Sequence, residues 1–307
     1  MAEIQIRGEL PGDEEAINVV NCRAFRHADE GQIIDDMRAV YPRYDRRFSV
    51  AAWHGEEMVG HALFSPVRLR LMGGMVRALA VGPVAVGPDF QRRGIGGQIL
   101  NYGHELGRQE GYVFAFLLGH SSYYPRYGYQ TRSFGFSKVE VDVENLPEPT
   151  LALDSRPVQP ADLPWLVERL EAELADVDFG WLWGATLGEW RLSGIDALVW
   201  RDADGRRVAY TMRAARQRDQ LALLLAEDPQ AVRQVLAKLR PDKLEHHPAG
   251  WLAQNALDPA WASTSAESSE AAMVCLLQEG ALDAYWAAVE KGRPPGHVNW
   301  PLPFLAH

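Results

Sequence analysis

The sequence is poor in cysteine. Its 307 residues contain two, Cys22 and Cys275, which lie far apart, and neither belongs to a CxxC pair. A disulfide framework needs several cysteines, and a structural zinc site usually needs paired ones. The sequence therefore predicts two reduced thiols, no disulfide scaffold and no metal site.

Long hydrophobic runs are also missing. The sequence has no stretch of about 18 apolar residues, the length needed to span a bilayer. The N-terminus lacks the order of basic, apolar and small residues that marks a signal peptide. We therefore expect a cytoplasmic protein without a membrane partner.

Acidic residues outnumber basic ones. The sequence has 41 aspartates and glutamates and 31 lysines and arginines, which gives a formal net charge of −10. Such a surface repels polyanions and tolerates cationic substrates, so we expect no nucleic-acid partner. With 47% hydrophobic residues, the chain is long enough for two globular domains.

Tryptophan is scarce in the N-terminal half. Of the ten tryptophans, Trp53 is the first and Trp165 the next, and a proline-containing stretch at 145–149 lies between them. This change in composition predicts a domain boundary at that stretch, with domains at 1–148 and 149–307.

A faint internal repeat links the two predicted domains. Residues 6–25 and 155–174 each have the pattern of a short strand, a turn with proline and aspartate, and an amphipathic helix. The second domain is therefore predicted to be a diverged copy of the first.

Apolar periodicity predicts an α/β fold for the first half. Two apolar runs in 49–70 flank a Gly-Glu-Glu turn, which is typical of an antiparallel hairpin, and 112–118 is apolar throughout, as in a strand buried on both faces. A mixed sheet with a helix crossing between its last two strands follows. The predicted elements are strands at 4–7, 49–54, 58–70, 79–86 and 112–118, a helix from about residue 13, helices at 29–40 and about 94–110, and a short helix near Tyr123.

The stretch "VGPDFQRRGIGGQIL", residues 86–100, joins a predicted strand to a predicted helix through a glycine-rich loop. Glycines there let the free N–H groups of the first helical turn approach an anion, which the helix dipole and two arginines also favour. The alternative is a turn with its arginines in solvent. The spacing is not GxGxxG and no P-loop lysine is present, so a dinucleotide or ATP is disfavoured.

These residues resemble the GCN5-related N-acetyltransferases (GNAT), especially a bacterial subgroup with a "YYPRFGF"-like motif. The family signature Q/R-x-x-G-x-G/A matches Gln91 to Gly96, and the second motif matches "YYPRYGY" at 123–129. The resemblance covers about residues 4–140. It implies a mixed, mostly antiparallel GNAT-type sheet flanked by helices.

The resemblance also implies acetyl-CoA as co-substrate. Backbone N–H groups of the loop would bind its pyrophosphate, and the preceding strand would pair with its pantetheine arm. A bulge at Gly82-Pro83 would open a slot for that arm, unless the two residues merely end a shorter strand. The implied binding residues are Val84, Ala85, Val86, Gln91, Arg92, Arg93, Gly94, Ile95, Gly96 and Gly97.

The motif further implies a general acid at Tyr124, because a tyrosine stays protonated at neutral pH and can protonate the departing thiolate. The alternative is an aromatic ring that only packs. His120 follows the apolar strand and is a candidate base. The alternatives are that a chain of water molecules accepts the proton and that His120 has only a structural role. His61 is expected to serve the sheet.

Four acidic residues fall on the segment that walls the acceptor site in this family. They either recruit a cationic amine or form a solvated helix face, and we favour the second interpretation. They are Asp29, Glu30, Asp35 and Asp36.

The second half departs from the signature. In place of the glycine loop it has Glu-Asp-Pro-Gln-Ala-Val at 227–232, so this degenerate GNAT-like domain is predicted not to bind CoA, and Asp228 is predicted to cap a helix. The tryptophan-rich stretch 179–192 is assigned to core, interface or acceptor pocket, and 298–307 to an edge strand or arm.

Together these features predict an acetyl-CoA-dependent N-acetyltransferase that acts on a primary amine of a small molecule or peptide. The alternative is a non-catalytic acyl-CoA-binding or regulatory module. A homodimer stays open, and nothing in the motifs identifies the acceptor.

Overall fold

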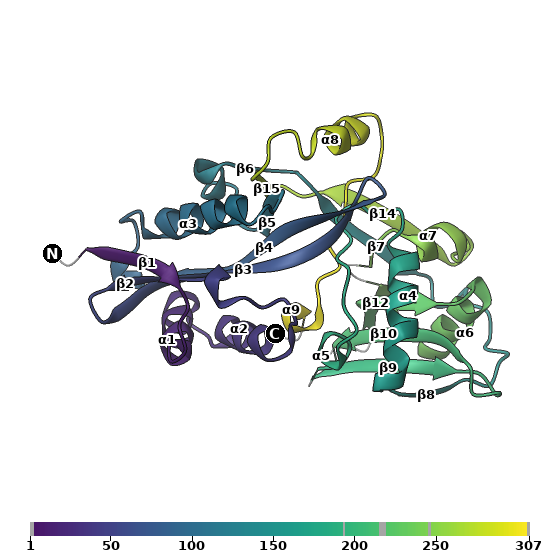
Figure 1. The fold of residues 1–307 in the computed structure, drawn as a ribbon. Coiled ribbons are helices and arrows are strands. Elements are labelled where there is room, and N and C mark those ends of the chain that lie inside the picture. The colour runs from purple at the N-terminus through teal and green to yellow at the C-terminus, as the bar shows by residue number, and fades with distance from the viewer. Residues whose placement is uncertain (1–2, 193, 215–218, 245–246, 306–307) are drawn as a thin grey trace.

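The computed structural model describes residues 3–192, 194–214, 219–244 and 247–305. Its strands form three sheets (Figure 1), and helices cover the faces of the largest one. Within the described residues, no helix combines the length and apolar character needed to cross a membrane.

The first sheet has seven strands and is antiparallel except between β4 and β5, as the sequence predicted. In spatial order its strands are β1 (Ile4–Gly8), β2 (Ser49–His54), β3 (Glu57–Leu71), β4 (Gly74–Val86), β5 (Phe114–Leu118), β15 (Ala272–Leu276) and β6 (Tyr129–Gln130). The helix between β4 and β5 was predicted, whereas the strand from 272–276 beside β5 was not.

Three helices cover this sheet. α1 (Glu14–Phe25) and α2 (Asp29–Val40) lie on one face and α3 (Ile95–Gln109) on the other (Figure 1). Gly103 lets α3 approach closely, because an added Cβ would lie 2.2 Å from the ring of Phe64. Short 3₁₀ helices follow the loops, namely η1 (Arg46–Phe48), η2 (Pro88–Phe90), η3 (Tyr124–Tyr127) and η4 (Pro160–Asp162).

Two four-stranded sheets are formed mostly by the second half. One contains, in spatial order, β12 (Leu223–Ala226), β10 (Arg207–Ala214), β9 (Ile195–Arg201) and β8 (Asp154–Pro157). The other contains β11 (Gln220–Leu221), β13 (Lys243–Leu244), β7 (Gly135–Val141) and β14 (Ala262–Ser268). The helices are α4 (Leu163–Glu173), α5 (Leu187–Trp190), α6 (Pro229–Leu239), α7 (Trp251–Asn255), α8 (Asp283–Glu290) and α9 (Leu302–Leu305).

The order of elements in the second half repeats that of the first. Each strand from β8 through β9 and β10 to β12 pairs antiparallel with the next, as in β1 to β4. The helix α6 then leads to β13, which runs parallel to β11. Asp228 caps α6 as predicted, since its side chain accepts a hydrogen bond from the Ala231 N–H.

The two halves exchange strands. β15 lies between β5 and β6 in the first sheet, while β7, which follows β6 in the chain, lies between β13 and β14. The predicted boundary at residue 148 stays a prediction, but each side of it supplies a strand to the other.

The two halves also begin with the same turn. Arg7 and Asp13 form a paired ion bridge, and the Leu10 N–H donates to the aspartate at 2.7 Å. Arg156 and Asp162 repeat this arrangement, with Gln159 N–H donating at 2.8 Å. The two turns are alike, and the duplication stays a prediction.

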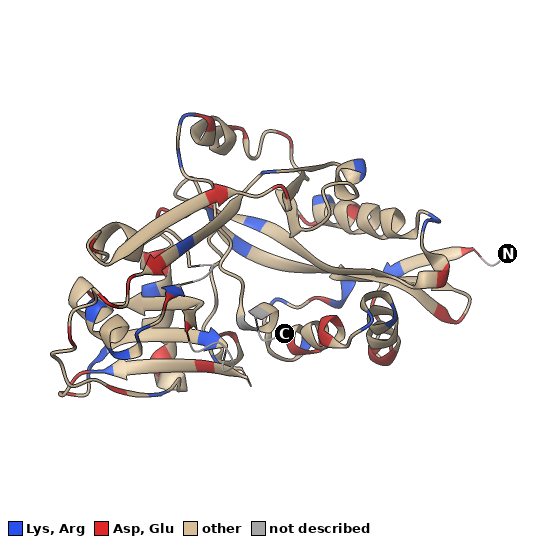
Figure 2. Ribbon diagram, turned by 180° about the vertical axis from the view of Figure 1, so that it is seen from behind, with Lys and Arg blue, Asp and Glu red and all other residues tan. Residues whose placement is uncertain are grey.

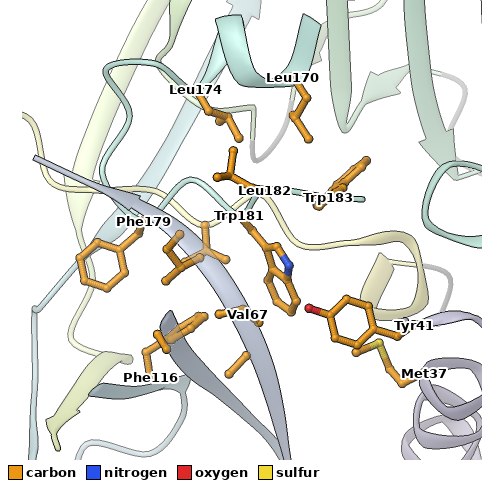
Figure 3. Packing of buried hydrophobic residues seen from close by; sticks show 14 of the residues in the cluster. Met37, Tyr41, Val67, Phe116, Leu170, Leu174, Phe179, Trp181, Leu182 and Trp183 are labelled. Atoms are coloured by element: carbon orange, nitrogen blue, oxygen red, sulfur yellow. The ribbon is translucent and has the colours of Figure 1, made fainter. Parts of the chain in front are cut away.

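Charged residues are interspersed along both halves, with acidic residues on α1 and α2 (Figure 2). The core is shared between the halves, and the stretch 179–192 belongs to it. Trp181 is fully buried and points toward Tyr41 and Val67 (Figure 3). Backbone bonds between 179–182 and β3 hold this stretch against the first sheet.

Candidate active site

The glycine loop presents N–H groups at the start of α3. The first hydrogen bond of the helix runs from the Gln98 N–H to the Gly94 carbonyl at 3.1 Å, so the N–H groups of 95–97 precede the helical ladder. Arg92 and Gly94 have φ of 62° and 78°, in the left-handed region. The loop can therefore bind phosphate through its backbone.

Two tyrosines explain why the next residues are glycines. A Cβ at Gly96 would lie 2.3 Å from the Tyr123 hydroxyl oxygen, and one at Gly97 would lie 2.3 Å from a ring carbon of Tyr127. The "YYPRYGY" motif therefore packs directly on the first turn of α3. The two motifs that were identified separately in the sequence form one structure.

The bulge in β4 is confirmed. Ala62 of β3 pairs with Val84 and Phe64 pairs with Val81, so two residues of β4 lie opposite one of β3. Pairing between β4 and β5 ends at Ala80 and Phe116. Beyond that point the two strands line cavities instead of bonding to each other.

One cavity, which we call the loop cavity, encloses about 730 Å³ beside the glycine loop. Most predicted binding residues line it. Ala85 is buried in the sheet, Gly97 lies under Tyr127, and the Arg93 guanidinium packs over the Phe90 ring at 5.1 Å. The lining residues are Val84, Val86, Phe90, Gln91, Arg92, Gly94, Ile95, Gly96, His120, Ser122, Tyr123, Tyr124, Arg126 and Tyr127.

A second cavity, which we call the inner cavity, encloses about 510 Å³ and shares Val84, His120 and Tyr124 with the first. Its walls come from both halves of the chain. They are formed by Phe25, Glu30, Ile33, Val81, Gly82, Pro83, Val84, Leu118, Gly119, His120, Tyr124, Phe136, Trp300 and Phe304.

Tyr124 lies where the two cavities meet. Its ring contacts those of Tyr123 and Tyr129 edge to face, with centroids 5.1 and 5.6 Å apart. Burial raises the pKa of the Tyr124 hydroxyl to about 12. The hydroxyl is therefore protonated at neutral pH and can donate a proton.

His120 also borders both cavities, and its side chain is exposed. Its carbonyl oxygen accepts hydrogen bonds from the N–H groups of Tyr123 and Tyr124 at 2.9 and 3.3 Å. The backbone of His120 therefore orients the turn that carries the tyrosine. The candidate base therefore lines both cavities, and its catalytic role stays a prediction.

Other histidines near the sheet are structural. His61 is fully buried, its ring nitrogens contact Ser49 at 2.9 Å and Asn21 at 3.4 Å, and burial lowers its pKa to about 3. His104 contacts the Tyr129 hydroxyl at 2.9 Å, and burial lowers its pKa to about 4. Both rings are therefore neutral at physiological pH.

The four acidic residues on α2 divide into different environments. Glu30 lines the inner cavity. Asp35 pairs with Arg38 and Asn18, and Asp36 accepts from Gln32 at 2.9 Å. Asp29 is exposed. The solvated-face interpretation therefore does not describe Glu30.

Several cavity residues were missed in the sequence. Phe136 lies on β7, and Trp300 and Phe304 lie on the C-terminal segment. The sequence predicted an arm there but not its position. The tryptophan-rich stretch 179–192 is core, and the tryptophan that lines the cavity is Trp300.

Comparisons with known proteins match this description. Residues 5–132 match a family model described as an acetyltransferase (GNAT) domain. An uncharacterized N-acetyltransferase of Escherichia coli K12, YjhQ, is 32% identical over 120 residues, which is 38% of this chain and 65% of that protein. The match thus spans slightly less than two thirds of that relative.

Solved structures resemble both halves. A GCN5-related N-acetyltransferase from Kribbella flavida aligns with a TM-score of 0.69 at 15% identity, over 89% of this chain and 71% of its own. A GNAT family acetyltransferase from Brucella melitensis in complex with acetyl-CoA is 32% identical, covers 42% of this chain and 84% of its own, and has a TM-score of 0.37.

Proposed function

Because this chain belongs to the GCN5-related N-acetyltransferase superfamily, we propose that it transfers the acetyl group of acetyl-CoA to a primary amine. The observation that carries the proposal is the meeting of two cavities at Val84, His120 and Tyr124. One cavity has the features of a CoA site, and the other gives a second substrate access to the same point.

The loop cavity fits acetyl-CoA by its chemistry. The N–H groups that precede the ladder of α3 suit the pyrophosphate, and Arg92 adds a cation at the cavity wall. The half-buried edge of β4 after the bulge, at Val84 to Val86, suits the extended pantetheine arm. The opposite edge of this slot is the end of β5.

The proposed reaction needs one bond formed and one broken. The amine nitrogen attacks the thioester carbonyl carbon, the new C–N bond forms, and the C–S bond breaks as the tetrahedral intermediate collapses. The thiolate takes a proton, and the amine nitrogen loses one. Tyr124 donates the first proton, and His120 or water accepts the second.

The alternative, a non-catalytic acyl-CoA-binding module, required Tyr124 to lie away from the thioester position. Tyr124 is among the residues that line both cavities, which favours the enzyme.

The proposal is tested by isothermal titration with acetyl-CoA, with NADH as a control ligand. We expect one acetyl-CoA per chain and no NADH binding. Arg92→Glu should weaken acetyl-CoA roughly tenfold, because a charge-assisted bond to phosphate is lost. Arg93→Glu is the matched control and should change the affinity less, since this side chain packs over Phe90 outside the cavity lining. Absence of acetyl-CoA binding would overturn the proposal.

A further inference from the structure

The inner cavity is apolar and carries one carboxylate. Of the described residues that line it, Glu30 alone has an acidic side chain, and most others are aromatic or aliphatic. Its volume of about 510 Å³ suits a molecule with a ring or branched skeleton rather than a very small amine.

Glu30 is placed to take a cationic partner. Its Oε2 atom is enclosed and lies 3.0 Å from Nδ1 of His27, an ion pair that exists only while that imidazole is charged. An imidazole is charged only when it is protonated. Because an enclosed carboxylate oxygen without a donor is costly, a cationic N–H group from a ligand would stabilise it.

Aromatic rings from segments distant in the sequence form another part of the wall. Trp300 and Phe304 contact each other with centroids 5.4 Å apart, and Trp300 also packs on Phe116 of β5 at 5.9 Å. Such rings favour an apolar group and leave hydroxyl groups of a ligand without partners. A polyhydroxylated amine would therefore lose hydrogen bonds on entry.

This aromatic wall is held rigidly. The side-chain oxygen of Asn299 accepts a hydrogen bond from the backbone N–H of Trp181 at 2.6 Å, and the side-chain amide of Asn299 donates to the Trp181 carbonyl at 3.0 Å. The Nδ1 atom of His297 accepts from the Ser137 N–H at 2.9 Å. These bonds join the arm to the stretch 179–192 and to β7, so the wall is held in place before a ligand binds.

From these observations we infer that the acceptor is an apolar, ring-bearing primary amine, with its cationic nitrogen recognised by Glu30 and its ring held by Trp300 and Phe304. This inference rests on the proposed transferase function and names its substrate class. The ammonium form binds at Glu30, and loss of its proton precedes attack on the thioester.

The test is direct binding, so that it does not depend on turnover. The protein with CoA added is titrated with three probes, 2-phenylethylamine, its uncharged analogue 2-phenylethanol, and ethanolamine, which keeps the charge and lacks the ring. We expect 2-phenylethylamine to bind at least tenfold more tightly than either of the other two.

Variants separate the two recognition elements. Glu30→Gln should weaken 2-phenylethylamine about tenfold, as expected for loss of a bond to a charged group, and leave 2-phenylethanol unchanged. Trp300→Ala should weaken both ring-bearing probes. Asp36→Asn is the matched control on the same helix and should leave all three unchanged, because Asp36 lies outside the cavity lining.

The outcomes are distinguishable from those of the proposed function. If acetyl-CoA binds and ethanolamine binds as tightly as 2-phenylethylamine, or Glu30→Gln has no effect on 2-phenylethylamine, the substrate inference is overturned and the transferase proposal stands. Failure of acetyl-CoA to bind overturns the transferase proposal, and the binding of the three probes still decides the chemistry of the inner cavity.

Discussion

Tyr124 illustrates how one side chain acquires a property from its surroundings. Its hydroxyl is removed from water by the neighbouring aromatic rings, and this burial raises its pKa to about 12. A raised pKa keeps the proton on the oxygen at neutral pH, so that a proton is available when the C–S bond breaks. The same environment makes the residue unsuitable as a base at neutral pH.

Replacing this hydroxyl tests its proposed role. Tyr124→Phe should lower kcat about 100-fold, because general acid catalysis is lost, while the Kd for acetyl-CoA changes less than threefold. The measurement is release of the CoA thiol with an accepted amine, together with titration of acetyl-CoA. Tyr102→Phe, on the exposed face of α3, is the control. An unchanged kcat for Tyr124→Phe contradicts the assignment.

At the scale of elements, the repeated turn contributes a pH-dependent term to stability. Burial alone would raise the pKa of Asp162, but hydrogen bonds from Arg156, Arg207 and the Gln159 N–H lower it to about 2. A carboxyl whose pKa is lower in the folded state stabilises the fold above its unfolded pKa. This contribution is lost as the pH falls from about 4 to about 2.

Replacing Asp162 with the uncharged asparagine removes the contribution of its carboxylate to stability. Asp162→Asn should lower the free energy of unfolding by ~2 kcal/mol at pH 7, and the difference from the unsubstituted protein should shrink as the pH falls below 4. Urea unfolding at pH 7, 4 and 3 measures it. Asp154→Asn, at an exposed pair with Arg201, is the control with a small expected effect. A penalty that is constant with pH argues against the ionic origin.

At the scale of the whole molecule, the exchanged strands make the halves interdependent. Without residues 272–276, β5 would lose its partner on one side, and without 135–141 the strands β13 and β14 would lose the strand between them. Open edges of this length, with buried side chains exposed, are prone to aggregation. We therefore expect neither half to fold alone.

A split at the predicted boundary tests this expectation. Fragments 1–148 and 149–307, whose ends lie in an exposed loop, should be insoluble or unfolded when produced separately and should copurify as a one-to-one complex when produced together. Circular dichroism and size-exclusion chromatography measure the outcome. A cooperative thermal transition of either fragment alone contradicts the prediction and supports two independent domains.

Local signals in the sequence determined the elements of the first half and the glycine loop. The helix at 29–40 and the strand at 49–54 were predicted with the bounds that the structure has, and β4 begins five residues before its predicted start at residue 79. Such elements depend on periodicity and turn residues that lie next to one another in the chain. The glycine loop and the tyrosine motif were each identified for the same reason, whereas their packing on each other was not predicted.

Tertiary structure alone decided which distant residues meet. The sequence did not identify Glu30 rather than Asp36, or Trp300 rather than Trp181, as a cavity residue, because cavity lining depends on what packs beside each side chain. The insertion of residues 272–276 beside β5 joins segments more than 150 residues apart. The physical reason is that burial and strand pairing between distant segments depend on the whole chain, whereas motifs and helix starts depend on a few adjacent residues.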